Sequence, residues 1–499
     1  MPSRSPNSTY STQGSEYFEK RSLRRHARVL HLWAMGVAAV ISGDFFGWNY
    51  GLLSGGFGGM FLAVAIMTVM YAGLCLSIAE MSAALPHSGG AYSFARTAMG
   101  RWGGYLTGLA ENMEYILTPA TIVVGIGGYL GAIFGTPKSF EPLWWLAAYS
   151  LFVILNVLGV ELAFRFSVFI AAAALLVLAV FWVAAIPHLD FTRFALDVPA
   201  APARSTFLPQ GIPGILACLP FALWLYLGIE QLPLAAEESH DPSRDMPRAL
   251  IYGLLTLVVC SFLTLYVSAS IAPGATKLAT SDEPLILGFQ TVFATKAWTK
   301  TLAAVACVGL IASFHTIIFA YGRQIYSLSR AGYFPPFLSE THSKHKTPVR
   351  ALIAGSALGL LAALGIYLTG QKSSVGATLL NMAVFGAVLA YILQMVSFVL
   401  LRRNLPAAER PYVSPLGVTG AITAAAIACV TLVTLFQNPD YARGVWGAAI
   451  WFLLGIAYFA IYARHRLVLS PEEEFAVLHQ KERHQKERHQ KERHQKSKS

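Results

Sequence analysis

Apolar segments of about 20 residues, the length that an α-helix needs to cross the hydrocarbon core of a bilayer, recur along the whole chain. Only 13% of the 499 residues are charged, whereas soluble domains carry about 25%. This pattern predicts an all-α polytopic membrane protein. We number its twelve predicted transmembrane spans in chain order as residues 30–54, 57–82, 103–134, 143–160, 164–187, 212–236, 248–272, 298–329, 349–369, 374–401, 415–436 and 444–463.

The polar ends of the chain delimit this membrane domain. We expect an N-terminal tail at residues 1–29, a twelve-helix membrane domain at 30–465 and a C-terminal tail at 466–499. The N-terminal tail lacks the apolar core of a removable signal peptide. The C-terminal tail repeats His-Gln-Lys-Glu-Arg from about His479 to Lys496, a composition typical of a solvated segment.

Lys and Arg gather on one side of the predicted membrane. By the positive-inside rule both termini then face the cytoplasm, and we expect the membrane to be a plasma membrane, specifically a bacterial inner membrane. The basic residues are spread over many loops and form no single face, which argues against nucleic-acid binding. They lie in the N-terminal tail and in the loops after even-numbered spans, as at Arg24, Arg25, Arg101, Arg165, Arg248, Lys346, Arg402 and Arg410.

The cysteines have neither disulfide nor metal-ligand spacing, and all lie in apolar stretches, as is usual for small core residues. We therefore expect no metal site and no cofactor. The five are Cys75, Cys218, Cys260, Cys307 and Cys429.

Asp44 lies in the middle of span 1, between Gly43 and Gly47. A carboxylate at the centre of a membrane helix costs about 2.5–3.5 kcal/mol and usually marks a pathway, a proton relay or a ligand counter-ion. The glycines allow the helix to break there, which exposes backbone groups that can hold a small polar solute. Span 1 therefore indicates a transporter whose substrate is a cation.

Span 6 carries a similar combination, because Glu230 follows Gly228 at mid-span and Pro220 and Pro233 bracket the stretch. The prolines weaken helical hydrogen bonding there. If the first ten spans form two inverted repeats of five, spans 1 and 6 correspond. Interrupted spans at corresponding positions are the best sequence pointer to a transport site.

Further polar groups lie inside spans 3 and 8. Glu111 and Glu114 are three residues apart and project from one face of span 3. In span 8, His315 could carry a proton, although a lone histidine in a helix is more often a hydrogen-bonded core residue. Ser313 and Thr316 could contribute to a sodium site or bond their own helix. Aromatic faces can attract an ammonium group, and the candidates near Asp44 include Phe46, Tyr115, Phe221 and Trp224.

The chain resembles the amino acid–polyamine–organocation (APC) transporters over residues 30 to about 465. Three motifs carry this resemblance besides the break in span 1: PHSGGAY at 86–92, WLYLGIE at 224–230 with EESHDPSRDMPR at 237–248, and RAGYFPP at 330–336. Two stretches are more narrowly similar to the ethanolamine permeases, namely ISGDFFGWN at 41–49 and GLAENMEY at 108–115.

The resemblance implies a leucine-transporter-type fold, with a 5+5 inverted repeat plus two helices and with helices 1 and 6 broken at mid-membrane. In amino acid carriers of the family the span 1 break is glycine-rich, and its free N–H groups bind the substrate carboxylate. Asp44 replaces the last glycine here and would repel that carboxylate. The resemblance places substrate contacts at Ser42, Gly43, Asp44, Phe46, Glu114, Tyr115, Phe221, Trp224, Leu225, Leu227 and Gly228, and a gating position at Glu230.

These observations predict a secondary transporter that takes up ethanolamine, as ethanolammonium, by alternating access. The alternative is a permease for an amino acid or another small amine; a membrane enzyme or a sensor is a further alternative of a different class. We expect a proton as coupling ion, with Glu111 and His315 as its leading carriers, and sodium near Ser313 as the alternative. Besides the substrate, membrane lipid is the only partner that we expect.

Overall fold

Helices make up nearly all of the regular structure in the computed structural model, which describes residues 13, 15–281, 283–293, 299–368, 375–406, 408–437, 442–471 and 473–474. Within these residues, eleven helices are long and apolar enough to cross a membrane. The all-α polytopic prediction is confirmed. The helices of the second half that matter below are α9 (Pro242–Ala269), α12 (Thr299–Arg330), α13 (Val349–Leu368), α14 (Val375–Asn404), α15 (Gly417–Gln437) and α16 (Ala442–Ile461).

The number of continuous spans differs from the predicted twelve because span 1 is not a continuous helix. It comprises α2 (Val29–Val40), α3 (Ser42–Phe45), the short helix η1 (Trp48–Tyr50) and the start of α4 (Gly51–Ala84). Gly56 interrupts α4 with φ 65° and ψ −172°, a conformation that glycine adopts without steric cost. This kink falls between predicted spans 1 and 2. Helix α4 therefore contains the last residues of predicted span 1 and all of predicted span 2.

Span 6 is broken in the predicted region. Helix α8 (Gly211–Trp224) ends at Trp224, and a 3₁₀ helix, η5 (Ile229–Glu238), begins four residues after Leu225. Residues 225–228 form turns between the two. Gly228 has φ 112°, which favours glycine over any residue with a side chain. The interruptions predicted for spans 1 and 6 are therefore both present.

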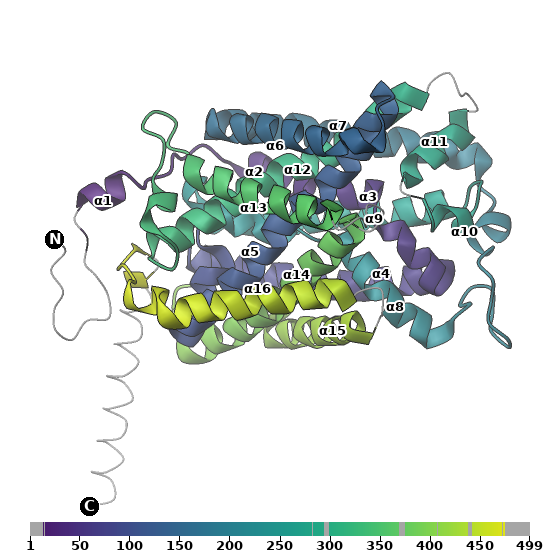
Figure 1. The fold of residues 1–499 in the computed structure, drawn as a ribbon. Coiled ribbons are helices and arrows are strands. Elements are labelled where there is room, and N and C mark those ends of the chain that lie inside the picture. Colours follow the sequence, from purple (N-terminus) through teal and green to yellow (C-terminus); the bar gives the residue numbers. More distant parts are fainter. Residues whose placement is uncertain are drawn as a thin grey trace, which may run out of the picture.

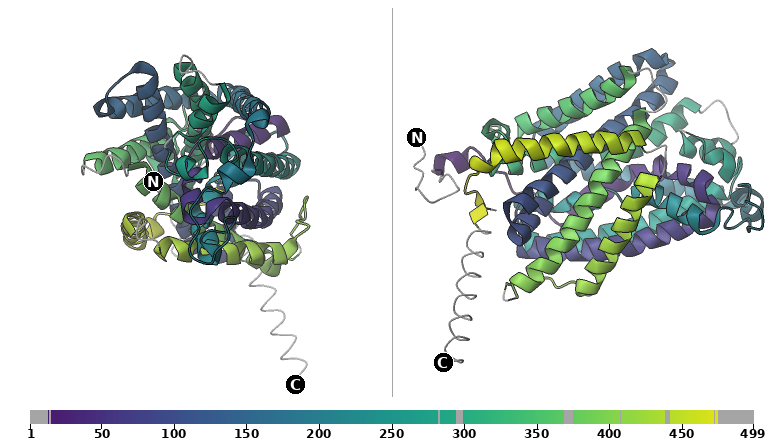
Figure 2. Two further views of the ribbon diagram at one scale, coloured as in Figure 1. Left: turned by 90° about the vertical axis from the view of Figure 1, so that its right-hand side faces the viewer. Right: turned by 60° about the horizontal axis from the view of Figure 1, so that its bottom comes forward.

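The helices differ in how deeply they lie in the bundle. Helices α5 (Gly90–Phe134) and α12 form its centre, since 78% of the most apolar 18 residues of each helix is buried, whereas only 17% of the corresponding residues of α16 is buried. Figure 1 places α15 and α16 along one edge and α6 (Glu141–Val157) with α7 (Val160–Ala185) along the opposite edge, and the end-on view in Figure 2 agrees. The edge helices present their apolar side chains outward, as lipid-facing helices do.

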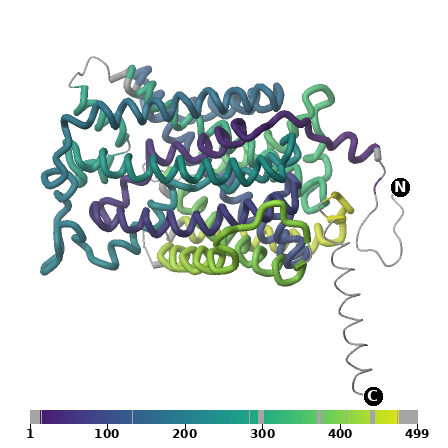
Figure 3. The backbone as a smooth tube through the Cα atoms, turned by 180° about the vertical axis from the view of Figure 1, so that it is seen from behind, coloured from purple at the N-terminus to yellow at the C-terminus, as the bar shows by residue number. Residues whose placement is uncertain are grey.

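Both ends of the described chain lie at the same end of the bundle. Helix α1 (Ser15–Glu19) and the residues after α16 are found there, whereas α10 (Ala275–Leu278) and α11 (Pro284–Phe293) lie at the opposite end (Figures 1 and 3). We call these the terminal end and the outer end. The arrangement agrees with an even number of membrane crossings. That the terminal end faces the cytoplasm stays a prediction from the charge pattern.

Residues that flank the predicted membrane domain pack against the terminal end. Arg21 is buried and donates from Nε to Ser339 Oγ at 2.8 Å and from Nη2 to the Pro336 carbonyl at 3.1 Å. Ala27 forms a parallel bridge with Ser239, just after η5. The N-terminal segment thus lies against the broken span 6 at one side and the loop after α12 at the other.

The segment after α16 is also packed. Glu473 is fully buried; its Oε2 accepts from Arg96 Nε at 2.6 Å, and its Oε1 accepts from the hydroxyls of Tyr92 at 3.1 Å and Tyr333 at 3.0 Å. The Val468 amide donates to the Ala331 carbonyl at 2.9 Å. Residues 466–471 and 473–474 are therefore part of the folded body, and the His-Gln-Lys-Glu-Arg repeats lie outside the described residues.

Candidate substrate site

The breaks in spans 1 and 6 lie directly against each other. A Cβ atom added to Gly43 would lie 2.5 Å from the Trp224 carbonyl oxygen and 3.2 Å from the Leu225 Cα atom. From the other side, Trp224 Nε1 donates to the Phe46 carbonyl at 3.0 Å. Gly43 is required here because only a residue without a side chain permits so close a backbone approach.

Ser313 holds the span 1 break from the opposite side. Its hydroxyl donates to the Ala38 carbonyl at 2.8 Å and accepts from the Ser42 amide at 3.0 Å. One side chain of α12 thus satisfies two backbone groups that the broken helix leaves without their usual partners. Thr316 bonds within its own helix, to the carbonyls of Ala312 and Ser313. The hydroxyls of Ser313 and Thr316 thus both bond to backbone groups. These bonds give no support to the alternative of a sodium site.

Asp44 is 1% exposed, and neither of its carboxyl oxygens has a hydrogen-bond partner among the described residues. The Thr264 hydroxyl on α9 lies beside this carboxyl group without completing a bond of ordinary geometry, and it has no other partner in the described part of the chain. Buried polar groups are almost always hydrogen-bonded. An unsatisfied carboxyl next to an unsatisfied hydroxyl, at the junction of two broken helices, is therefore a strong indication of a site for a polar ligand.

Tyr226 forms one wall beside Asp44 and is fixed in place. Its hydroxyl lies near the Asp44 carboxyl and is bonded at 2.7 Å both to Thr68 on α4 and to Ser261 on α9. The ring of Tyr71 packs on it, with ring centroids 5.1 Å apart. The wall is thus held by side chains of two helices, α4 and α9, which favours a defined ligand geometry over an adaptable one.

The carboxyl groups predicted on spans 3 and 6 form a second cluster. Glu114 and Glu230 contact each other. Tyr391 on α14 donates to Glu114 Oε1 at 3.4 Å, and the Gly228 amide donates to Glu230 Oε2 at 3.0 Å. Glu111 accepts from Gln324 at 2.8 Å and from Tyr115 at 3.4 Å. Tyr71 links this cluster to the Asp44 wall, since its hydroxyl lies 3.1 Å from that of Tyr391.

The remaining predicted residues divide between the site and its surroundings. Trp224, at the end of α8, and Leu225 and Leu227, in the span 6 break, are all buried. Phe46 and Phe221 are partly buried and flank Tyr50, with ring centroids 6.0 and 6.5 Å from it. His315 lies apart from both carboxyl groups of the breaks, held by Asn156 at 3.2 Å and by the Ala163 carbonyl at 3.2 Å. That setting supports the core-residue alternative for His315.

Sequence reasoning missed four residues that complete these clusters, namely Tyr71, Thr264, Gln324 and Tyr391. Each is a polar side chain inside an apolar span. The sequence shows this feature, but many other polar residues also lie within the spans. Only their partners on other helices distinguish these four residues from the rest.

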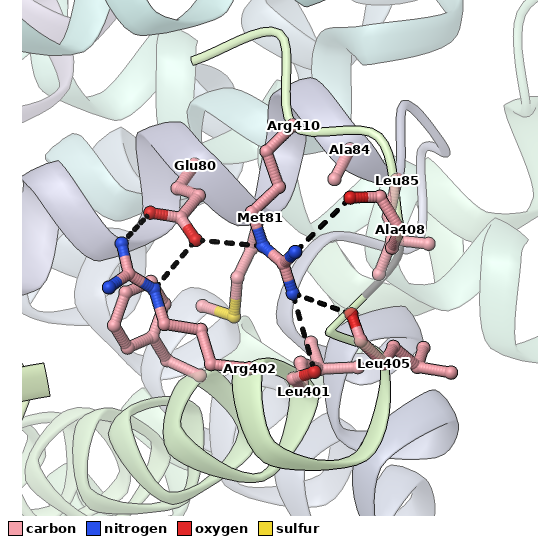
Figure 4. A pocket seen from close by; sticks show the side chains of 10 residues that line it. Glu80, Met81, Ala84, Leu85, Leu401, Arg402, Leu405, Ala408 and Arg410 are labelled. Carbon is pink, nitrogen blue, oxygen red and sulfur yellow. Dashed lines mark hydrogen bonds and ion pairs between the residues drawn. The ribbon is translucent and has the colours of Figure 1, made fainter. Parts of the chain in front are cut away.

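A separate pocket lies at the terminal end, between α4 and the loop after α14 (Figure 4). The Glu80 carboxylate in its wall pairs with Arg402 at 2.5 Å and with Arg410 at 3.1 Å. Arg410 also donates to backbone carbonyls, including that of Leu405 at 2.8 Å. These polar groups already satisfy one another, so the pocket offers a ligand little beyond apolar surface.

The close approach at Gly43 leads to a first prediction. Gly43→Ala places a methyl group against the backbone of residue 224, which must move, and such overpacking typically costs about 1–3 kcal/mol. We expect transport in proteoliposomes to fall about tenfold or more. Gly365→Ala is the matched control, because a Cβ atom there would meet nothing within 4 Å. Wild-type transport by Gly43→Ala would show that transport does not require the close contact between the two helix breaks.

Together, the apolar spans, the two opposed helix breaks and the unsatisfied buried carboxyl group define a polytopic membrane transporter. Comparison with known proteins agrees: residues 31–466 match the amino acid permease family, and the chain belongs to that family. The names of the family and of the relatives found in the comparison denote transporters and not enzymes.

Three relatives illustrate the range of the family. The chain is 28% identical to an uncharacterised transporter of Rhizobium meliloti, over 77% of this chain and 81% of that protein. It is 26% identical to a branched-chain amino acid permease of Bacillus subtilis, over 90% and 96%. It is 22% identical to a methylthioribose transporter of the same species, over 91% and 96%.

Proposed function

We propose that this permease takes up ethanolamine, as ethanolammonium, across the bacterial plasma membrane by alternating access, with both termini in the cytoplasm. The observation that supports the proposal best is the Asp44 carboxyl group, which is buried where the two helix breaks meet and has no hydrogen-bond partner among the described residues. A carboxylate in that position is suited to an ammonium group. It is unsuited to a ligand that brings its own carboxylate, because two like charges would then share one desolvated site.

The surroundings of Asp44 suit the rest of so small a ligand. Beside the carboxylate, Thr264 offers a hydroxyl that makes no hydrogen bond of ordinary geometry to any described residue. Asp44 would be the principal counter-ion, and Glu114 would bond the hydroxyl or the ammonium group. Backbone carbonyls around Ser42 and in the span 6 break would complete the shell. The aromatic rings of Phe46 and Trp224 would favour a cation further.

The second candidate is an amino acid or another small amine, and the relatives favour it. The family is named for amino acids, and one relative that matches this chain over 96% of its own length is a branched-chain amino acid permease. The two candidates differ in one chemical respect, which is whether the substrate carries a carboxylate. The family likeness supports the amino acid, whereas Asp44 supports the amine.

A competition panel separates them. Uptake of labelled ethanolamine into proteoliposomes is measured with excess unlabelled ethanolamine, choline, serine, alanine or putrescine. We expect ethanolamine to compete fully, and serine and alanine not to compete, because their carboxylates would meet Asp44. Choline should compete poorly, because its three methyl groups block the N–H donors. Strong competition by serine, or no ethanolamine uptake, would contradict the proposal and favour the amino acid.

A further inference from the structure

The contact between Glu114 on α5 and Glu230 on η5 joins two acidic side chains in the interior of the bundle. Glu114 is fully buried and Glu230 is 3% exposed. No Lys, Arg or His among the described residues lies within 4.0 Å to form an ion pair with either. Two ionised carboxylates in contact within a membrane repel each other strongly, so that one of them ordinarily takes up a proton.

The hydrogen bonds of the two carboxyl groups point to where that proton lies. Each group has one satisfied oxygen: Glu114 Oε1 accepts from Tyr391, and Glu230 Oε2 accepts from the Gly228 amide. The other two oxygens, Glu114 Oε2 and Glu230 Oε1, have no donor among the described residues. An ionised carboxylate can only accept. One proton on either group supplies the missing donor and satisfies both oxygens at once.

Among the described residues, the groups around the pair do not supply a positive charge. The titratable neighbours are Glu111 and Tyr115 on α5, Tyr71 and Cys75 on α4, and Tyr391 on α14. All are neutral or acidic. Glu111 differs from the pair because both of its oxygens already accept from neutral donors.

The pair also touches the part of the molecule that must move. Glu230 holds the amide of Gly228, which is the last residue of the span 6 break and follows Leu227 of the candidate substrate site. Loss of the proton would leave two like charges between α5 and this break and would push them apart. Proton occupancy and the position of the break are therefore linked, and each must bias the other.

From these contacts we infer that Glu114 and Glu230 share one proton, and that this pair is the site where the transport cycle binds and releases its coupling proton. The inference rests on the proposed transport function and replaces Glu111 and His315 as the leading proton carriers. The proton passes between a carboxylic acid and a carboxylate, and it leaves to water when the pair separates, so that the step needs no other reactant.

Infrared spectroscopy of the purified protein at neutral pH tests the shared proton without any substrate. Wild type should show a carboxylic acid C=O band that shifts with ¹³C-labelled glutamate. Glu114→Gln and Glu230→Gln should each remove the same band, because the remaining carboxylate is then ionised and bonded by the amide. The control Glu161→Gln, at an exposed surface pair with Arg165, should keep it. Two different bands lost, one from each variant, or no band lost, would overturn the shared proton.

Uptake under a pH gradient tests the coupling. The readout is each protein's uptake with the gradient divided by its own uptake without it. One coupled proton changes accumulation by up to about tenfold per pH unit, and this ratio should fall to about one in Glu230→Gln. An unchanged ratio in that variant, or no response in wild type, would overturn the coupling role. The assay is run with both ethanolamine and leucine. Uptake of leucine but not of ethanolamine would refute the ethanolamine proposal, and the leucine ratios would still test the coupling role of Glu114 and Glu230. The infrared result does not depend on which substrate is transported.

Discussion

Asp44→Asn is expected to abolish ethanolamine binding while leaving the protein folded. The amide nearly preserves the shape of the side chain but removes its charge, and an ammonium group left desolvated without its counter-ion costs several kcal/mol. Ethanolamine has only four non-hydrogen atoms, so its total binding free energy cannot much exceed about 6 kcal/mol. That ceiling corresponds to a dissociation constant no better than tens of micromolar. The loss of one charge is thus comparable to the whole affinity.

The measurement is a binding isotherm for each purified variant, with monodispersity checked by size-exclusion chromatography. Asp241→Asn is the matched control, because its carboxylate pairs with Arg244 at the surface, 46% exposed. Glu114→Gln should weaken binding less than Asp44→Asn if Glu114 bonds the hydroxyl. Near-wild-type affinity in Asp44→Asn would mean that the carboxyl group in span 1 has a structural role and that the substrate is not ethanolammonium.

Arg323→Met is expected to destabilise the protein by about 3–5 kcal/mol, because it leaves the carboxylate of Glu238 buried without its counter-charge. Both side chains of this pair are fully buried, 2.8 Å apart. The pair is also incompletely hydrogen-bonded, since Arg323 Nε and Nη1 and Glu238 Oε2 lack partners among the described residues. The double variant Arg323→Met with Glu238→Leu should therefore recover most of the lost stability, as replacement of a buried pair by apolar residues often does.

Thermal unfolding in detergent, followed by intrinsic fluorescence, gives the required ranking of the variants. Arg350→Met provides the comparison, because its pair with Glu340 is 53% and 41% exposed, and surface pairs contribute only about 0–1 kcal/mol. We expect Arg323→Met to be far less stable than wild type, and the double variant and Arg350→Met to be close to it. If Arg323→Met were as stable as Arg350→Met, the buried ion pair would not hold the terminal end of span 6 to α12.

The helix breaks could be predicted because their causes are local. Gly43 beside Asp44, and Gly228 between two prolines, weaken helical hydrogen bonding within a few residues, and composition alone indicates this. The spans were predictable for the same reason, since length and hydropathy are properties of a continuous segment. The helix count differed only where a break and a kink at Gly56 divide the chain differently from its apolar runs.

The partners within the site could not be predicted, because they come from distant parts of the chain. Tyr391 lies 277 positions from Glu114, and Ser313 lies 271 positions from Ser42. Helix periodicity places a residue on a face, but it does not say which helix that face meets. For this reason His315 and Glu111 were plausible proton carriers from sequence, and only their neighbours direct attention to Glu114 and Glu230.

The bond between Arg96 and Glu473 has a consequence for the synthesis of the protein. The two residues are 377 positions apart, and Glu473 leaves the ribosome only after every membrane helix has been made. Until then, the segment that contains Glu473 cannot pack against Arg96. We expect the junction of α5 with the loop after α12 to be open to water and to proteases during that time. A chain that is cut short before Glu473 would therefore present that junction to quality control, whereas a chain that includes Glu473 closes it with the segment that follows α16.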